Sequence, residues 1–320
     1  MTPEELLDGV RSRRRRALGR AISLVERLGP EGRELAAALH PDTGRAWRVG
    51  VTGSPGVGKS TLLSALVAHL RAAERTVAVV SVDPTSPFTR GAVLGDRIRL
   101  ADHFVDPGVF IRSMASRGHQ GGLAEATADA VLVLDAAGFD VVLVETVGSG
   151  QNEVEVQALT ETVVLAIMPG SGDGVQAIKA GLMEIPDVLA VTKADRPGAD
   201  HLVSELRHAL ALVPAGPWEP PIVPVVATEG RGIPELWAEV ERHRAFLGAE
   251  GRLEARRREG LGRQIRALAA DRLARRLDRA ADPEFLDGLI DEVLERRLDP
   301  AGAVDRVLDR AGLAAPGEGG

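Results

Sequence analysis

One stretch of the sequence combines the residue types that could hold a chain of phosphates. Residues 53–60 read Gly-Ser-Pro-Gly-Val-Gly-Lys-Ser and match the pattern G-x-x-x-x-G-K-S/T, in which a glycine-rich turn joins a strand to a helix. The glycines let backbone N–H groups turn around a phosphate, Lys59 would reach the outer phosphates, and Ser60 would offer its hydroxyl to Mg²⁺. We therefore predict a nucleotide-binding loop made of Gly53, Ser54, Pro55, Gly56, Val57, Gly58, Lys59, Ser60 and Thr61.

An acidic residue and a glycine after a later apolar run would complete this site. Glu145 directly follows the apolar run 141–144, and Gly148 comes three residues after it. Domains with such a loop place the carboxylate that holds magnesium at the end of a strand, and a glycine N–H that senses the γ-phosphate shortly after it. The pattern predicts these two roles for Glu145 and Gly148.

A third motif bears on the choice of base. Residues 192–195 read Thr-Lys-Ala-Asp and resemble the guanine-reading N-K-x-D motif, with Thr192 in place of the usual asparagine and Lys193 at the lysine. The Asp195 carboxylate could accept both the N1–H and the exocyclic N–H of guanine, a donor pair that adenine lacks. The motif favours GTP, with ATP as the alternative. Ala227 and Thr228 follow the next apolar run, where they would back the base.

The use of lysine and cysteine narrows the chemistry further. Of the 39 basic residues only three are lysines, Lys59, Lys179 and Lys193, and two of these fall in the motifs above. A compact ammonium is therefore expected to matter where lysine is kept. Because the chain has no cysteine, disulfides, thiolate metal sites and thiol nucleophiles are excluded. Oxygen ligands remain for a metal.

Charge and hydropathy argue against two classes of partner. The net charge is −7, and the aromatic residues are three Trp and six Phe, which is a poor composition for nucleic-acid binding. The longest unbroken aliphatic runs, such as 163–168, are far shorter than the ~18 residues of a membrane span. The basic run Arg13–Arg16 is followed by an amphipathic stretch rather than an apolar signal region. We expect a cytoplasmic protein without membrane or nucleic-acid partners.

The elements that position these motifs follow from the spacing of apolar residues. Short apolar runs alternate with helical stretches between residues 47 and 226, which predicts a doubly wound, mostly parallel α/β sheet. The predicted strands are 49–52, 77–82, 109–112, 141–144, 163–168, 188–192 and 222–226, and the proline-rich residues 214–221 form a surface loop. Residues 5–40 are predicted as helix, and helices also follow residue 234, broken by Pro283 and Pro300. These last helices must pack on the α/β domain or on a second copy.

Three longer stretches resemble a known family. Residues 83–99, 145–155 and 169–179 are similar to the methylmalonyl-CoA mutase-associated GTPases of the MeaB type, a branch of the metallochaperone GTPases often labelled arginine/ornithine transport ATPases or kinases. The resemblance extends from about residue 15 to about residue 300. It implies a GTPase that assists an adenosylcobalamin-dependent acyl-CoA mutase, gating cofactor loading and protecting the mutase. It also implies a homodimer joined through C-terminal helices.

The resemblance also implies roles for individual residues. Ser60, Asp83 and Glu145 correspond to magnesium-associated positions, and Asp96 to a switch carboxylate near the metal and the γ-phosphate. Lys179 lies in a stretch similar to the family's additional switch. The resulting organisation is an N-terminal helical arm at 1–44, a P-loop GTPase domain at 45–245 and a C-terminal helical dimerisation segment at 246–320.

The residue that orients the attacking water stays open at this point. Gly148 is followed by Ser149, and a glutamine appears only at Gln151, so hydrolysis should be slow and stimulated by a partner. Gln151, Asp96 and Lys179 are the three candidates.

Two other functions remain possible, a kinase or ATPase of an amino-acid transport system and a nucleotide-gated scaffold with negligible turnover. No D-x-H-x-x-G motif for cobalamin is present, so the partner should hold the corrinoid. The run Arg13–Arg16 could contact an acidic partner or face solvent.

Overall fold

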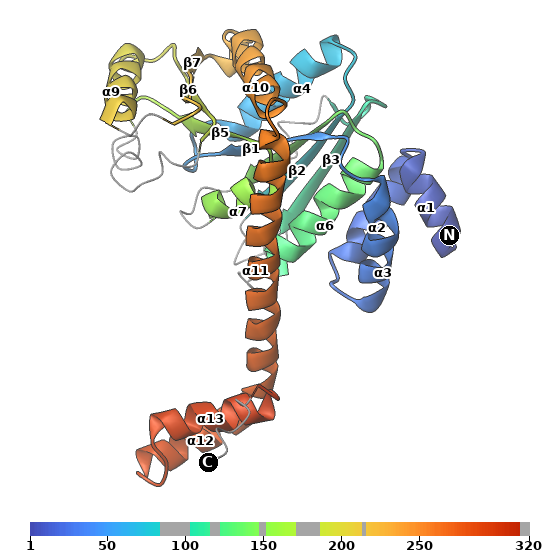
Figure 1. Ribbon diagram of the computed structural model, residues 1–320, viewed down its shortest axis with the longest axis vertical. Helices are drawn as coiled ribbons and strands as arrows, with labels where there is room; N and C mark the ends of the chain where they lie inside the picture. Colours follow the sequence, from blue (N-terminus) through green and yellow to red (C-terminus); the bar gives the residue numbers. More distant parts are fainter. Residues whose placement is uncertain (84–102, 116–121, 147–151, 171–185, 213–215, 314–320) are drawn as a thin grey trace. The chain divides into compact units, whose positions relative to one another are not determined.

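The computed structural model describes residues 1–83, 103–115, 122–146, 152–170, 186–212 and 216–313. Within these ranges, seven parallel strands form one sheet in the order β3-β2-β4-β1-β5-β6-β7 (Figure 1). The strands are β1 (Trp47–Thr52), β2 (Val77–Asp83), β3 (Val109–Ala115), β4 (Val141–Thr146), β5 (Thr162–Ile167), β6 (Val188–Thr192) and β7 (Ile222–Val225). All seven apolar runs predicted as strands are strands, and the doubly wound α/β class is confirmed.

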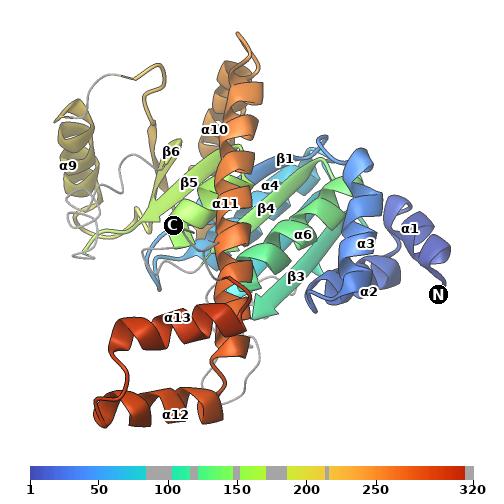
Figure 2. The same ribbon diagram turned by 60° about the horizontal axis from the view of Figure 1, so that its bottom comes forward.

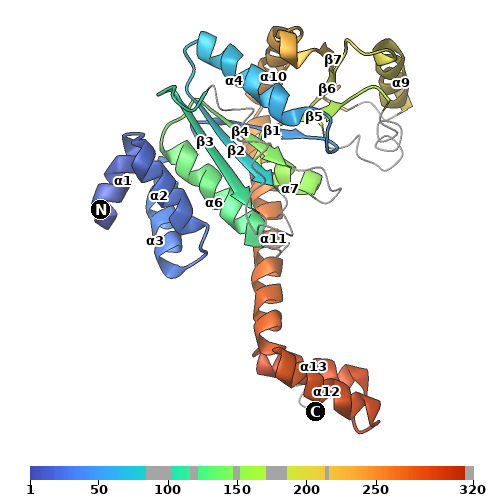
Figure 3. The same ribbon diagram turned by 180° about the vertical axis from the view of Figure 1, so that it is seen from behind.

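Helices cover both faces of this sheet. On one face lie α4 (Lys59–Ala72) and α10 (Ile233–Leu247), and on the other lie α6 (Gly122–Ala136), α7 (Asn152–Leu159) and α9 (Ala199–Leu212). Figures 1 and 3 show the sheet from opposite sides, and Figure 2 shows it in a tilted view. Side chains of β4 are buried along its whole length, which explains why the strand sequences are continuously apolar. The strand order reverses on either side of β1, so the loop after β1 lies at the switch point, where such sheets bind ligands.

The N-terminal segment differs from the single helical stretch predicted for residues 5–40. It forms three helices, α1 (Pro3–Arg11), α2 (Arg15–Val25) and α3 (Pro30–Leu39). The chain turns between them at Arg13 and Leu28, whose φ angles of 53° and 54° are left-handed and cannot continue a right-handed helix. The apolar periodicity is helical on both sides of each turn, so it did not reveal the breaks. The three helices pack on α6.

The basic run near the N-terminus makes contacts within this chain. Arg15 donates to the carbonyl oxygens of Asp106 (3.1 Å) and Val109 (2.6 Å). Arg13 lies over the ring of Phe139, with 5.8 Å between the guanidinium carbon and the ring centre. These contacts fasten the N-terminal helices to the sheet edge and to the end of α6, which gives the run a structural role.

The chain divides into two compact units, residues 1–264 and 265–320. The second unit contains the rest of α11 (Arg252–Ala280), followed by α12 (Pro283–Leu294) and α13 (Pro300–Arg310). Pro283 and Pro300 occupy first-turn positions of their helices, where a missing N–H costs nothing. Residues 216–221 are irregular, as predicted for the proline-rich loop. None of the helices described here is long and apolar enough to cross a bilayer.

Candidate phosphate and guanine site

The loop after β1 adopts a backbone that only glycine tolerates at key positions. Gly53, Gly56 and Gly58 have φ angles of 139°, 78° and 102°, all in the region that favours glycine. A Cβ on Gly53 would lie 2.2 Å from the carbonyl oxygen of Ala166, which no side chain could avoid. Gly58 is also the N-cap of α4, so the loop delivers its last residues directly to a helix N-terminus, which favours anions.

Lys59 is the first residue of α4 and is buried. Its Nζ donates to the carbonyl oxygens of Gly53 (2.6 Å) and Ser54 (3.1 Å). The ammonium therefore lies across the loop, at the helix end where the outer phosphates of a bound nucleotide are expected. Because these two acceptors are neutral carbonyls, a phosphate oxygen could replace either of them with a stronger, charge-assisted bond.

The Thr-Lys-Ala-Asp turn at residues 192–195 also binds the loop. Lys193 Nζ donates to the carbonyl of Gly56 at 2.7 Å, and Thr192 Oγ1 donates to the carbonyl of Val57 at 2.8 Å, with the Ile167 carbonyl as a second acceptor at 3.1 Å. The C=O and N–H of a trans peptide point in opposite directions. Because Thr192 binds the Val57 carbonyl, the N–H of Gly58 in the same peptide points away from Thr192. Thr192, which replaces the usual asparagine, therefore braces the loop.

A hydroxyl and a carboxylate are buried together beside the loop. Ser60 Oγ donates to Glu145 Oε1 at 3.0 Å, and both residues are only 5% exposed. The second carboxylate oxygen, Oε2, accepts from Ser81 of β2 at 2.9 Å. A hydroxyl and a carboxylate are hard oxygen donors of the kind that Mg²⁺ prefers, so these residues fit the metal predicted for Ser60 and Glu145. Sequence reasoning missed Ser81, because one serine within a valine-rich strand gives no signal.

The residues predicted to read the base lie at one corner of the sheet. Asp195 is exposed and follows β6, and Ala194 N donates to the Val225 carbonyl at 3.1 Å, which ties this turn to the end of β7. Ala227 and Thr228 follow in a single turn, η4 (Ala227–Glu229), that contacts α4. The arrangement leaves the Asp195 carboxylate accessible at the same edge of the sheet as the loop.

Several predicted site residues lie outside the described residues. They are Asp96, Gly148, Gln151 and Lys179. Asp83 is the last residue of β2, so its backbone lies at the same edge of the sheet as the phosphate loop. Its side chain is not among the described parts of the structure. The roles predicted for these five residues stay predictions.

The amino-terminal end of the sheet carries a different kind of polar cluster. Trp47 Nε1 donates to Thr162 Oγ1 (3.2 Å), which lies 2.9 Å from His243 Nδ1, and His243 Nε2 lies 3.4 Å from Asp187 Oδ1. Burial lowers the pKa of His243 to about 3, and the positive charges of Arg256 and Arg242 add to the shift. At neutral pH the imidazole is therefore uncharged, so its approach to Asp187 at 3.4 Å is not an ion pair.

Asp187 is held from two further sides. Arg256 Nη2 lies 2.9 Å and the Val163 N–H 2.8 Å from its Oδ2. Burial raises the pKa of Asp187 to about 6, although Arg256 and the Val163 N–H both act to lower it.

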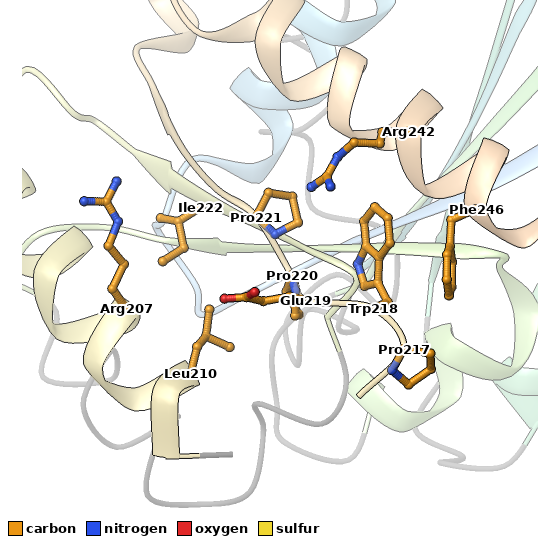
Figure 4. A pocket seen from close by; sticks show the side chains of 10 residues that line it. All are labelled: Arg207, Leu210, Pro217, Trp218, Glu219, Pro220, Pro221, Ile222, Arg242 and Phe246. Atoms are coloured by element: carbon orange, nitrogen blue, oxygen red, sulfur yellow. The ribbon is translucent and has the colours of Figure 1, made fainter. Parts of the chain in front are cut away.

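Beside this cluster, α9, α10 and residues 217–222 surround a hollow of about 500 Å³. In Figure 4, Trp218 stands beside Phe246, with 5.1 Å between ring centres, and Arg242 lies over the indole at 4.6 Å. Among the described residues, none of those predicted to bind nucleotide lines this hollow.

A parallel sheet with a glycine loop at its switch point, a lysine across that loop and a T-K-A-D turn behind it defines a P-loop nucleotide-binding protein. Comparison with known proteins names the branch. The model of the family "Methylmalonyl Co-A mutase-associated GTPase MeaB" matches residues 18–282. The chain belongs to this family and is a GTPase.

Relatives support the same assignment. The chain is 47% identical over 309 residues to a protein of Pyrococcus abyssi described as a GTPase, with 95% of each chain covered. It is 32% identical over 273 residues to the mouse protein "Methylmalonic aciduria type A homolog, mitochondrial", covering 79% of this chain and 66% of the mouse protein. A crystal structure titled as an LAO/AO transport system kinase is similar with a TM-score of 0.70 and 29% identity, covering 96% and 97% of the two chains.

Proposed function

We propose that this GTPase is the chaperone of an adenosylcobalamin-dependent acyl-CoA mutase of the methylmalonyl-CoA mutase type. In this role it gates cofactor loading and protects the mutase. The observation that carries the proposal is the family match over residues 18–282, whose description names association with that mutase. The likeness to the mouse methylmalonic aciduria protein points the same way.

Magnesium dependence is part of the proposal. Ser60 and Glu145 would hold the ion, together with the carboxylates of Asp83 and Asp96 that the family resemblance assigns to the site. The bound ion would neutralise charge that develops on the phosphates during hydrolysis. Lys59 would exchange its loop carbonyls for the outer phosphates, and the loop N–H groups would bind the phosphate oxygens. One of Gln151, Asp96 and Lys179 would orient the attacking water.

We also propose that the chain is a homodimer joined through its C-terminal helices. Apolar side chains are exposed on the described helices of the second unit, and Leu294 is 74% exposed. The others are Ile265, Leu273, Leu286, Ile290 and Val304. A second copy would remove this surface from water. The proposed boundaries of 1–44, 45–245 and 246–320 place these helices in the dimerisation segment.

The proposed partnership is tested by coupling between nucleotide and mutase. If the mutase binds preferentially to one nucleotide state, nucleotide should change mutase affinity about 5- to 150-fold, and the mutase should change nucleotide affinity by the same factor. Titration calorimetry in both directions measures the two factors, and steady-state hydrolysis measures stimulation. Lys179→Ala should keep basal GTP binding but lose stimulation by the mutase, whereas Lys59→Ala should lose both.

The outcomes separate the alternatives. No effect of a methylmalonyl-CoA mutase on nucleotide affinity or hydrolysis would contradict the chaperone proposal. Transfer of the γ-phosphate to a protein rather than to water would instead support a transport-system kinase. Single-turnover hydrolysis that stays negligible with the mutase present would support a nucleotide-gated scaffold. Equal stimulation of the wild type and Lys179→Ala would remove Lys179 from the mechanism.

A further inference from the structure

Ser81 is a buried hydroxyl residue of β2 that donates to the carboxylate proposed for magnesium, Glu145, on the neighbouring strand. It lies in β2, is 1% exposed, and is the register partner of Glu145 in the adjacent strand β4. Its Oγ donates to Glu145 Oε2 at 2.9 Å, while Ser60 donates to Oε1 at 3.0 Å. The two serines thus hold the two oxygens of one carboxylate from different elements.

This arrangement fixes the plane of the carboxylate. A carboxylate held through one oxygen can rotate about its last bond, whereas bonds to both oxygens remove that freedom. Each carboxylate oxygen has two lone pairs, so accepting one hydrogen bond does not by itself prevent an oxygen from binding a metal or a metal-bound water. Ser60 donates its proton to Glu145, so its hydroxyl oxygen takes the donor role toward the carboxylate.

The neighbours of Ser81 are apolar, so packing alone does not explain a polar side chain at this position. On β2, Val77 and Val79 share its face and lie in an apolar core cluster with residues of α4. A hydroxyl buried among such residues is unfavourable unless it is hydrogen-bonded. Its hydroxyl donates to the Glu145 side chain, so the residue contributes through the site rather than through the core.

We propose that Ser81 is a positioning residue for magnesium, holding Glu145 in the orientation that supports the ion beside Ser60. The inference rests on the proposed magnesium site at Ser60 and Glu145. Partners that orient metal-binding side chains typically change metal affinity about 10- to 100-fold when they are removed. Because Ser81 is hydrogen-bonded to Glu145 across two neighbouring strands, it acts on the metal through that carboxylate.

The test measures magnesium dependence without using hydrolysis. Release of a fluorescent GDP analogue from the full chain is followed at increasing Mg²⁺ concentrations. In Ser81→Ala the Mg²⁺ concentration at half-effect should rise about tenfold or more, while the release rate in excess EDTA should equal that of the wild type. Ser113→Ala is the matched control, because Ser113 pairs with Ser81 from β3, on the side of β2 away from β4. Its half-effect concentration should be unchanged.

A second variant guards against misfolding. Ser81→Cys keeps a side chain of similar size with a weak donor, and the chain has no other cysteine to pair with it. It should shift the half-effect concentration upward, in the same direction as alanine. A wild-type value in Ser81→Ala, or in Ser81→Cys if the alanine variant does not fold, would overturn the inference, as would an equal shift in Ser113→Ala. GDP release that is independent of Mg²⁺ in the wild type would instead overturn the proposed metal site on which the inference rests.

Discussion

The two ends of the same sheet use charge in different ways. At the carboxyl end of the strands, Lys59 and Lys193 donate to neutral carbonyls of the phosphate loop. At the amino end, Glu161, which directly precedes β5, is 1% exposed and accepts from Arg48 and from Arg257 at 3.0 Å. At the first end, two lysines donate to backbone carbonyls that a phosphate oxygen could replace, and at the second end arginines pair with a buried carboxylate.

The choice between lysine and arginine follows the same division. Arginine presents a planar fork that can bind a carboxylate through two nitrogens, whereas lysine presents one compact charge on a flexible stem. At the amino end, Arg48 and Arg257 hold Glu161, and Arg256 holds Asp187. In a chain with only three lysines, placing two of them against the loop indicates that exchangeable contacts are needed there. The comparison predicts that variants at the loop end change activity, and variants at the other end change stability.

The largest effect is expected from Lys59→Ala at the loop end. A charge ~4 Å from a phosphate, at an effective dielectric of about 20, contributes on the order of 4 kcal/mol of gross attraction before desolvation. GTP hydrolysis should fall at least about a hundredfold, while the melting temperature without nucleotide changes little. Lys59→Arg should not restore the rate fully, because its planar fork differs from a point charge. Near-normal turnover in Lys59→Ala would exclude the loop as the phosphate site.

Glu161→Gln should give the largest loss of stability at the other end. The amide leaves Arg48 and Arg257 without an anionic partner, and removing one member of a buried ion pair costs about 3–5 kcal/mol. Because the two arginines are 26% and 31% exposed, solvent recovers part of this, and we expect ~3 kcal/mol by urea unfolding.

Glu229→Gln is the matched control for that loss. It removes the carboxylate of an exposed pair with Arg231 and should cost well below 1 kcal/mol. GTP affinity of folded Glu161→Gln should match the wild type. A large loss of affinity without a loss of stability would refute the division between the two ends.

Asp195→Asn tests the loop end by specificity rather than by rate. The amide can no longer accept two N–H groups of guanine, but it can pair with the 2-oxo edge of xanthine. Hydrogen bonds to a charged group contribute about 1.5–3 kcal/mol each, so preference should move from GTP toward XTP by at least about tenfold. Competition between the two nucleotides measures the change. An unchanged GTP preference would mean that Thr192–Asp195 does not read the base.

Most of the fold was predictable because its signals are local. Each strand of a covered parallel sheet is a continuous apolar run, and the phosphate loop needs its residue types within eight positions. The breaks at Arg13 and Leu28 were missed because neither residue type favours a left-handed turn, so tertiary packing of α1–α3 on α6 sets them.

The polar residues that act across the sheet were not predictable. Ser81 and Glu145 are 64 positions apart, and Arg257 and Glu161 are 96 apart. An acid just before a strand, such as Asp187, has the same local pattern as a solvated loop charge. Thr192 stands where asparagine is usual, and the motif alone does not predict that its hydroxyl donates to the loop at the Val57 carbonyl. Such roles depend on register and burial, which one sequence does not contain.

The pH dependence of stability should separate two groups at the amino end. The folded pKa of His243, about 3, lies below its unfolded value of ~6.5, so its contribution is complete above pH 6.5 and is lost as pH falls toward 3. The folded pKa of Asp187, about 6, lies above its unfolded value of ~3.9, so its contribution is complete below pH 4 and is lost as pH rises through 6.

Two variants isolate these contributions by urea unfolding at several pH values. Relative to His243→Gln, the wild type should lose stability as pH falls from 6.5, with a slope of at most ~1.4 kcal/mol per pH unit. Relative to Asp187→Asn, the wild type should lose stability as pH rises from 4 to 6. Slopes of the same sign in the two comparisons would contradict the charge states assigned to this cluster.

The smallest effect is expected from Thr192→Val, which removes one hydroxyl at the loop end and keeps the shape of the side chain. Its bond to the Val57 carbonyl is a neutral hydrogen bond, worth about 0.5–1.5 kcal/mol. Because this bond braces the loop and does not touch the base, affinities for GDP, GTP and XTP should all fall by the same factor, between about twofold and tenfold. Titration with the three nucleotides distinguishes this uniform loss from the exchange of preference expected for Asp195→Asn. If Thr192→Val changed the ratio of GTP to XTP affinity, Thr192 would belong to base reading rather than to the loop.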